Sequence, residues 1–584
     1  MNQDVTRILH VDLSSLTFEI KDRTDLSHLM GGTGLGCQLL AEEVHMDKDP
    51  LDPVQPIIFA RGVLAPYFPS ATQVAAVFRS PLTGYLGENF AGGSLAAAMF
   101  LANLNAVVIK GRADRPVRLT VGPRLIHIKK ADPLYGTGTE ECLRELYDLE
   151  SSPGFRSLVV IGQAGEKAVR FADLVVDRYW RFGGSGAGAL FGSKNLKSLM
   201  VYGDRNLPIP DVKVAGYREV FEHIHNRLVH SELMPLLHNL GTAVNLEKMQ
   251  SLMALPSRNS LQSQFDRLAS FTAKSLAQKH LVRQLSCTGC PIGCVHIGHY
   301  RRMFGSDSLE YEESHLPYDF ATVYALGSQL GLETPDDFWS LWEKVSGYGL
   351  DPLATGAALG WLTEAFEQGL VTENETGTPV AFGNVEGYLH ALDGLVGGET
   401  PLYQDLTQGA TVAADRWGGR DYVTEINRRA STGLHTGYDS FLSLALGFQQ
   451  PDFVHPLPNR SSPEPNRTIN TLIAQEARNC LNNSLGICRL ISEVYDMKTV
   501  SQALKSLGYR LSPRQLKIRS YDLYHLQQGL NRAMGLDPTR VTVPSRLFNI
   551  PTAQGFLEQN RFAEMLDIFA KQSWATEKEE VTLG

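Results

Sequence analysis

Three of the seven cysteines lie within eight residues, in the run Cys287-Thr-Gly-Cys290-Pro-Ile-Gly-Cys294. The short loops between these thiolates turn each sulfur back toward the same point, so the three can bind one soft metal centre. A fourth ligand must then come from elsewhere in the chain. Cys488 is the better candidate, and Cys480 is its rival. A site closed by so distant a ligand would be buried in a large fold, which favours an electron-handling centre.

The spacing of the run, C-x2-C-x3-C with a remote cysteine, favours a [4Fe–4S] cluster. Structural zinc is the alternative, because C-x2-C pairs are common in zinc sites and His296 and His299 lie just downstream. Gly289 and Gly293 would let backbone amides approach the sulfurs, which raises the potential of a cluster. An odd, uneven set of seven cysteines does not predict a disulfide framework.

Composition narrows the class of protein. The chain has 584 residues, of which 43% are hydrophobic and 20% charged, as in an ordinary globular protein of roughly three or four domain-sized units. A net charge of −9 without any Lys/Arg-rich run makes nucleic acid an unexpected partner. We find neither a signal peptide nor an apolar run of about 18 residues, so we expect a cytoplasmic protein with no membrane span.

The pattern of apolar residues and glycines changes near residue 207. Before it, short apolar segments alternate with glycines, and residues 7–20 have the pattern of a β-hairpin. After it, the apolar periodicity predicts mostly helices, among them 213–230, 270–284, 335–347 and 470–480. We therefore predict an α+β fold with a β-rich domain over residues 1–207, followed by two mostly helical domains over 208–400 and 401–584.

Two further patterns are candidates for function. The run Gly183-Gly-Ser-Gly-Ala-Gly188 could bind phosphate through its backbone amides, although tight backbone packing explains it equally well. The acidic run Glu310-Tyr-Glu-Glu313 lies shortly after the cysteines and could supply an acid–base group, or simply a solvated face. His435 and His455 are candidate proton-handling residues.

Taken together, these segments resemble the aldehyde ferredoxin oxidoreductase family, whose members are tungsten- or molybdenum-dependent enzymes with a bis-pterin metal cofactor and one [4Fe–4S] cluster. The resemblance follows the order of the chain over nearly its whole length. It is carried by Arg79-Ser-Pro-Leu-Thr-Gly84, Ala91-Gly-Gly93, Gly188-Ala-Leu-Phe-Gly-Ser-Lys-Asn-Leu-Lys197, the cysteine run, Glu310-Tyr-Glu312 and Gly486-Ile-Cys488.

The resemblance implies that the β-rich domain cradles the tungsten or molybdenum bis-pterin, with magnesium as a further candidate ion. It implies an aldehyde or related carbonyl substrate, a ferredoxin or small iron–sulfur subunit as electron acceptor, and an oligomer. Glu312 and His455 would be catalytic, and Cys287, Cys290, Cys294 and Cys488 would hold the cluster. The implied cofactor-binding residues are Asn89, Gly92, Gly93, Gly183, Gly184, Gly186, Gly188, Lys194, Asn195, Ser346, Asp351 and Asn483.

The chain departs from the family pattern at several cofactor positions. Gln73 and Gly184 stand where the family has arginines, which bind phosphate bidentately. Ser346 and Asn483 replace acidic residues that bind the pterins, and both can still accept hydrogen bonds.

An insertion near residues 313–320 makes Asp319 an alternative to Glu312. Two hypotheses follow from these departures. The chain is a divergent active oxidoreductase, or it is a catalytically silent relative that serves as an electron-relay or structural subunit. We favour the enzyme, because all four cluster cysteines are present. An electron-transfer cluster has little function without a redox centre that supplies its electrons.

Overall fold

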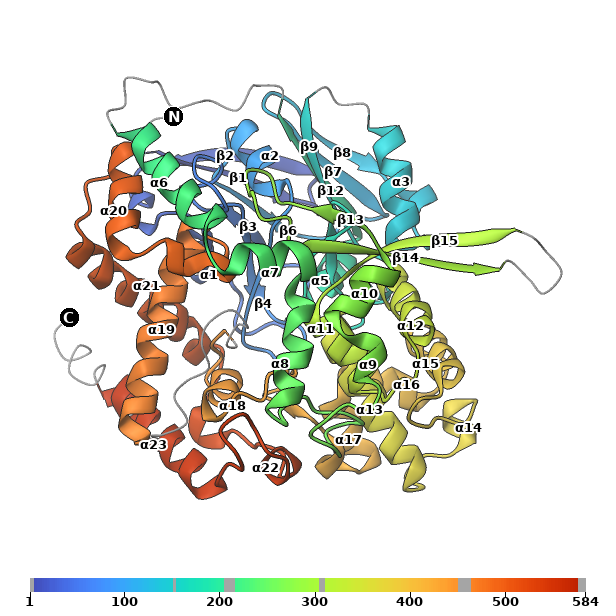
Figure 1. Ribbon diagram of the computed structural model, residues 1–584. Coiled ribbons are helices and arrows are strands. Elements are labelled where there is room, and N and C mark those ends of the chain that lie inside the picture. The colour runs from blue at the N-terminus through green and yellow to red at the C-terminus, as the bar shows by residue number, and fades with distance from the viewer. Residues whose placement is uncertain (1–4, 151–153, 204–215, 304–309, 450–463, 576–584) are drawn as a thin grey trace.

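The computed structural model describes residues 5–150, 154–203, 216–303, 310–449 and 464–575. Sheets dominate the first two hundred residues and helices dominate the remainder (Figure 1), which confirms the predicted α+β class. The predicted boundary near residue 207 lies outside the described residues, and the boundary at residue 400 stays a prediction. Among the described residues, no helix is both long and apolar enough to cross a membrane.

The first sheet has the strand order β2-β1-β6-β3-β4-β5 within the described residues. Its strands are β1 (Thr6–Asp12), β2 (Thr17–Arg23), β3 (Ile57–Arg61), β4 (Val74–Arg79), β5 (Leu86–Ala91) and β6 (Ala106–Lys110). The antiparallel pairing of β1 with β2 confirms the hairpin expected from residues 7–20. Every residue of β3 is buried, because α1 (Gly32–Glu43) covers one face and the second sheet covers the other.

The second sheet has the order β11-β10-β9-β12-β7-β8 in the described part of the chain. Phe59 of β3 contacts Phe182 and Phe191, with ring centroids 5.5 and 5.9 Å apart, and so joins the two sheets in one apolar core. This contact brings β5 beside β11. The strands are β7 (Val117–Val121), β8 (Ile126–Lys130), β9 (Phe155–Val160), β10 (Leu174–Val176), β11 (Trp180–Phe182) and β12 (Leu196–Gly203).

The helices form two apolar cores with these sheets. α19 (Pro465–Leu485), α21 (Pro513–Ala533) and α23 (Gln559–Ala575) pack around α1 and the first sheet. A second core includes α8 (Asn245–Ser251), α12 (Pro335–Tyr348), α13 (Pro352–Glu367), α15 (Val385–Gly397) and α17 (Ala410–Trp417). Other helices are α2 (Leu95–Leu101), α3 (Thr139–Leu149), α5 (Ala187–Ser193), α6 (Tyr217–Val229), α7 (Leu233–Leu240), α10 (Ala273–Lys279), α11 (Phe320–Val323), α18 (Tyr438–Ala445) and α20 (Met497–Ser506).

The structure differs from the predicted helix over residues 270–284. α10 ends at Lys279, and β13 (Leu281–Leu285) begins a three-stranded sheet with β14 (Val295–Met303) and β15 (Tyr311–Tyr318). β14 and β15 form a hairpin that projects from the body of the molecule (Figure 1). The prediction was wrong because residues 281–285 pair in antiparallel register with residues 295–298 of β14, and this cross-strand pairing overrides their local helix propensity.

The end of α19 docks against the end of β3 without space for a side chain. A Cβ atom at Gly62 would lie 2.1 Å from both the Gly486 nitrogen and the Leu485 carbonyl carbon. Gly486 ends the helix with a φ of +79°, a left-handed conformation that glycine adopts without strain. The turn that leads to Cys488 is therefore fixed against the first sheet by backbone contact.

We predict that Gly62→Ala destabilises the protein by about 1–3 kcal/mol, because the new methyl group meets backbone atoms that only a shift of α19 can move. A lower midpoint in thermal unfolding, followed by circular dichroism, would show this. Gly529→Ala is the matched control. It lies in α21 with no described atom within 4 Å of an added Cβ, so its midpoint should stay level or rise. Equal midpoints for the two variants would contradict the docking argument.

Candidate functional site

The structure brings Cys488 to the cysteine run. The pKa of the Cys488 thiol is raised well above its ordinary value, first by burial and then by the neighbouring thiols of Cys294, Cys290 and Cys287. Burial also raises the pKa of Cys294 to about 12, and Cys287 and Cys290 add to that effect. Four mutually interacting thiols are a poor arrangement for free thiolates. They become favourable once a bound metal centre deprotonates them.

Ser70 holds the two cysteine segments together. Its amide donates to the carbonyl of Gly289 at 3.1 Å, and its carbonyl accepts from the amide of Cys488 at 3.1 Å. Its hydroxyl lies 3.1 Å from the sulfur of Cys290. The amides of Ile292 and Gly293 also point at that sulfur and lower its pKa against the larger effect of burial. Backbone amides thus approach a cysteine sulfur in this loop, as the sequence suggested.

Cys480, the rival fourth ligand, lies elsewhere. It is fully buried in α19, and after burial the charges that raise its pKa are those of Glu476, Glu88 and Cys37 rather than the cysteine run. α19 therefore points Cys480 into the apolar core, and Cys488 follows its C-terminal turn toward the other three sulfurs.

The spacing of the sulfurs bears on the choice between zinc and a cluster. Tetrahedral zinc with Zn–S bonds of about 2.3 Å needs sulfurs about 3.8 Å apart. In the described part of the molecule, no three of these sulfurs lie within 4.8 Å of one another. His296 is also engaged, since its ring nitrogens face the carbonyl of His238 at 2.9 Å and the hydroxyl of Tyr318 at 3.4 Å. The arrangement suits a larger, multi-iron group better than a single ion.

A pair of buried carboxylates is the second feature of the site. A backbone bridge between Ala172 and Leu350 places Asp173 beside Asp351. Burial raises the pKa of Asp351 to about 6, and both burial and Asp351 raise the pKa of Asp173. Neither oxygen of Asp173 has a partner at full hydrogen-bond geometry among the described residues, although the amide of Gly184 is directed at this carboxyl group. Such acids can bind N–H groups of a polar heterocycle, and Asp351 also caps α13 through the amide of Ala354.

Arg181 of β11 lies among these acids. Its Nη1 is 3.8 Å from Asp173, its Nη2 donates to the hydroxyl of Ser346 at 2.6 Å, and its guanidinium lies over the ring of Trp342. Burial lowers its pKa, and Asp173, Asp351 and Asp319 oppose that shift. Its Nε and Nη1 have no hydrogen-bond partner within the described ranges. A buried cation with free donors is suited to bind an anionic group.

The predicted glycines lie at close approaches around this position. A Cβ at Gly183 would meet the carboxylates of Asp173 and Asp351, each at 2.9 Å, and one at Gly92 would meet the sulfur of Cys287 at 2.4 Å. Gly184 has a φ of +90° and faces open space. Gly93 accepts from the amide of Thr288 through its carbonyl at 3.0 Å.

Asn89 and Asn483 lie on different segments around the same region. Asn89 donates to the carbonyl of Gly183, and its Oδ1 has no partner in the described part of the chain. Asn483 lies near the end of α19 with both side-chain polar atoms buried and unpartnered in the described structure. Gln73, whose amide donates to the carbonyl of Gly486 at 3.1 Å, adds a fourth such buried atom, Oε1.

Four other predicted residues have packing roles. Lys194 is fully buried, donates to the carbonyls of Pro53 and Gln55 at 2.6 Å each, and has its pKa lowered by burial to about 7. Asn195 donates to the carbonyl of Ala113. Gly186 and Gly188 start α5 against backbone carbonyls. These residues fix α5 to its neighbours, and the side-chain nitrogens of Lys194 and Asn195 donate to backbone carbonyls.

The predicted catalytic residues lie in different parts of the molecule. Glu312 lies on the outer part of β15, where its side chain is 47% exposed and pairs with Arg302. Its cross-strand partner Arg302 lies eight residues beyond Cys294, so Glu312 lies at the outer end of the β14–β15 hairpin. Asp319, the alternative, caps α11 and is one of the charges that act on the pKa values of both Cys294 and Arg181. His455 lies outside the described residues.

His435 is placed in the interior. It has no exposed surface, and burial lowers its pKa to about 3. Both ring nitrogens lack a partner among the residues described. It contacts the ring of Phe441, and its carbonyl accepts from Ala553.

Sequence reasoning did not identify Ser70, Asp173 or Arg181. Asp173 carried a readable signal, since it is a lone acid inside the apolar segment Phe171-Ala-Asp-Leu-Val-Val176. No such sequence signal marks Ser70, because its role depends on two backbone hydrogen bonds to distant segments.

Two family models cover most of the chain. The model of the N-terminal domain of aldehyde ferredoxin oxidoreductase matches residues 8–203, and the model of domains 2 and 3 matches residues 219–573. The tungsten-containing aldehyde ferredoxin oxidoreductase of Pyrococcus abyssi is 27% identical over 98% of this chain and 96% of its own length.

Two other similar proteins are not described as aldehyde ferredoxin oxidoreductases. The aliphatic sulfonate oxidoreductase WOR-like subunit of Pyrococcus furiosus is 25% identical over 66% of this chain and 63% of its own length. Among solved structures, the active site complex BamBC of benzoyl coenzyme A reductase, in complex with 1,5-dienoyl-CoA, superposes with a TM-score of 0.81. It covers 97% of this chain and 94% of that chain at 19% identity, which supports the fold.

We predict that Cys488→Ser and Cys480→Ser have opposite outcomes. Anaerobically purified Cys488→Ser should lose most of its iron and its visible sulfur-to-iron absorption, because one of four converging thiols is gone. Cys480→Ser should keep about four irons per chain, because that thiol lies beside Glu476 in the core. Iron analysis and absorption spectra measure both. Full iron in Cys488→Ser would refute the assignment of this ligand.

Proposed function

Because this chain belongs to the aldehyde ferredoxin oxidoreductase family, as a divergent member, we propose that it oxidises an aldehyde or a related small carbonyl compound. Electrons would leave through a [4Fe–4S] cluster held by Cys287, Cys290, Cys294 and Cys488 to a ferredoxin-like acceptor in the cytoplasm. The convergence of the four thiols beside a set of buried, unpartnered polar groups is the observation that carries the proposal.

The described residues fit a tungsten or molybdenum bis-pterin. Buried polar atoms without partners in the described structure suit the many donors and acceptors of a pterin, and these belong to Asn89, Asp173, Arg181, Asn483 and Gln73. The carboxylates of Asp173 and Asp351 would accept from ring N–H groups. When bound, such a group supplies the two-electron oxidation of the carbonyl carbon.

The loss of two family arginines leaves a different phosphate environment. Gly184 and Gln73 provide no charge, but Arg181 places a buried guanidinium three residues before Gly184. We propose that Arg181 and the amides of residues 183–186 bind the phosphates. Asn89 would then position the Gly183 turn through its hydrogen bond to the carbonyl of that residue.

The chain's own part in the chemistry is to move protons and electrons. Oxidation of an aldehyde to an acid takes one oxygen from water and releases two electrons and two protons. The Asp319 carboxylate, near both Cys294 and Arg181, would accept a proton from the hydrated substrate. Cys287, Cys290, Cys294 and Cys488 would hold a cluster that can supply one-electron transfer, and the amides aimed at Cys290 would tune its potential.

A second candidate function is a subunit that relays electrons without oxidising a substrate. The neutral residues at positions 73 and 184 favour it, since they weaken the binding of an anionic cofactor. Relatives described as a WOR-like subunit and as part of the BamBC complex also suit a chain that works with a small iron–sulfur partner.

Elemental analysis of anaerobically purified protein separates the two functions. The enzyme should contain about four irons and one tungsten or molybdenum per chain. Arg181→Ala should lower the content of the heavier metal and leave iron unchanged, while Arg302→Ala on the outer hairpin should change neither. Four irons with no heavier metal in the wild-type chain would establish the relay instead.

Replacement of the two candidate carboxylates tests the proton step. Asp319→Asn should lower kcat by about 10²–10⁴ with metal content unchanged, because asparagine preserves the helix cap but not the base. Glu312→Gln should stay close to the wild-type rate, because that carboxylate is paired with Arg302 on the outer hairpin. Steady-state rates with an aldehyde and an artificial acceptor measure both. The reverse order would restore Glu312 as the base.

A further inference from the structure

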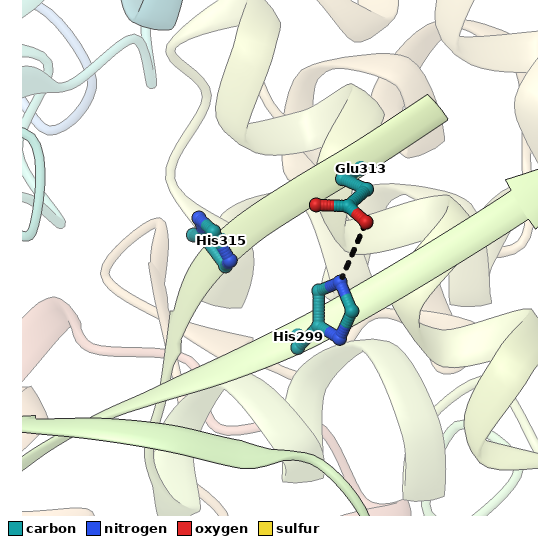
Figure 2. A group of neighbouring side chains, drawn as sticks. All are labelled: His299, Glu313 and His315. Atoms are coloured by element: carbon teal, nitrogen blue, oxygen red, sulfur yellow. Dashed lines mark ion pairs between the residues drawn. The ribbon is translucent and has the colours of Figure 1, made fainter. Parts of the chain in front are cut away.

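The base of the β14–β15 hairpin carries three metal-ligating side chains on one face. His299 and His315 are directly opposite one another across the two strands, and Glu313 lies two residues from His315 on the same strand. Side chains two residues apart on a strand share a face, so all three converge (Figure 2). One ligand atom from each lies within 4.8 Å of the other two, and no other such trio occurs within the described ranges.

The donor atoms are oriented toward one another. The Nε2 atom of His299 lies 3.7 Å from a carboxylate oxygen of Glu313, and the two imidazole rings have centroids 5.4 Å apart. That Nε2 is shielded from solvent and has no hydrogen-bond partner among the residues that the structure describes. A buried ring nitrogen without a partner is unusual in a protein, and a bound cation would satisfy it.

Positive charges around the trio set a limit on its affinity. Arg301 lies 3.5 Å from the same oxygen of Glu313, and Arg178 and Arg283 act on His315. Arg301 also makes a cation–π interaction, since its guanidinium lies 3.9 Å from the centroid of the Tyr311 ring. Arg178 also pairs with Glu140.

We propose that His299, Glu313 and His315 bind a divalent first-row transition metal ion of the Zn²⁺ type. Two imidazole nitrogens and one carboxylate are a ligand set that such ions prefer, and three protein ligands leave coordination positions open. The site is separate from the cysteines, since His299 lies five residues beyond Cys294, roughly 16 Å along an extended strand. Binding would join β14 to β15 at the point where the hairpin leaves the body.

Cobalt and zinc titrations of the iron-loaded, full-length protein test the site. We expect one Co²⁺ per chain, with weak d–d bands and no thiolate-to-cobalt absorption, and competition by Zn²⁺. His315→Ala should abolish this binding, and Glu313→Gln should weaken it by about tenfold or more. His223→Ala, an exposed histidine on α6, is the matched control and should bind as the wild type does.

Thermal melting curves distinguish a variant that has lost metal binding from one that has lost its fold. Added Zn²⁺ should raise the midpoint of the wild-type protein and leave that of His315→Ala unchanged, while both should have similar midpoints and equal iron contents without zinc. Equal Co²⁺ binding by wild type and His315→Ala, or cobalt spectra with intense thiolate absorption, would overturn the proposal. So would failure of the wild-type chain to bind either ion.

Discussion

The main-chain groups of Ser70 fix the relation between two segments that are far apart in the sequence. Its amide binds the cysteine run at Gly289, and its carbonyl binds the amide of Cys488. The adjacent bridge between Ala71 and Ile487 extends the same contact, and the close approach of Gly62 to Gly486 leaves α19 no freedom to withdraw. Backbone contacts of this kind depend on no side chain's charge, so the geometry of the four thiols can persist while nearby cofactor contacts change.

Features set by local sequence were predictable, and those set by contacts between distant segments were not. The β1–β2 hairpin and the cysteine run could be read directly, because alternation and short ligand spacing act within a few residues. The Asp173–Asp351 pair could not, because it exists only where Ala172 bridges Leu350. The position of Glu312 could not be predicted for a related reason: its motif matched the family, but its place on the outer hairpin depends on cross-strand pairing with Arg302.

The substitutions around the buried acids change the electrostatics together. Arg181 faces Asp173, Asp351 and Asp319, and its hydrogen bond goes to Ser346. An aspartate in place of Ser346 would neutralise more of the guanidinium's charge, since a carboxylate paired with arginine forms a charge-assisted bond. The serine accepts a hydrogen bond without adding negative charge. It therefore leaves Arg181 more of its charge for an anion, in a chain that lacks arginine at positions 73 and 184.

The cost of burying polar groups bears on whether a polar ligand binds among these residues. Asn89, Asp173, Arg181 and Asn483 each have buried polar atoms without a partner in the described structure. Each such group costs about 1–3 kcal/mol when neither a ligand nor a bound water satisfies it, and charged groups cost more. A chain that only relayed electrons would bear this penalty continuously, and replacing these groups with apolar residues would relieve it. Their joint presence around one region is most readily explained if a polar ligand occupies it in the working protein.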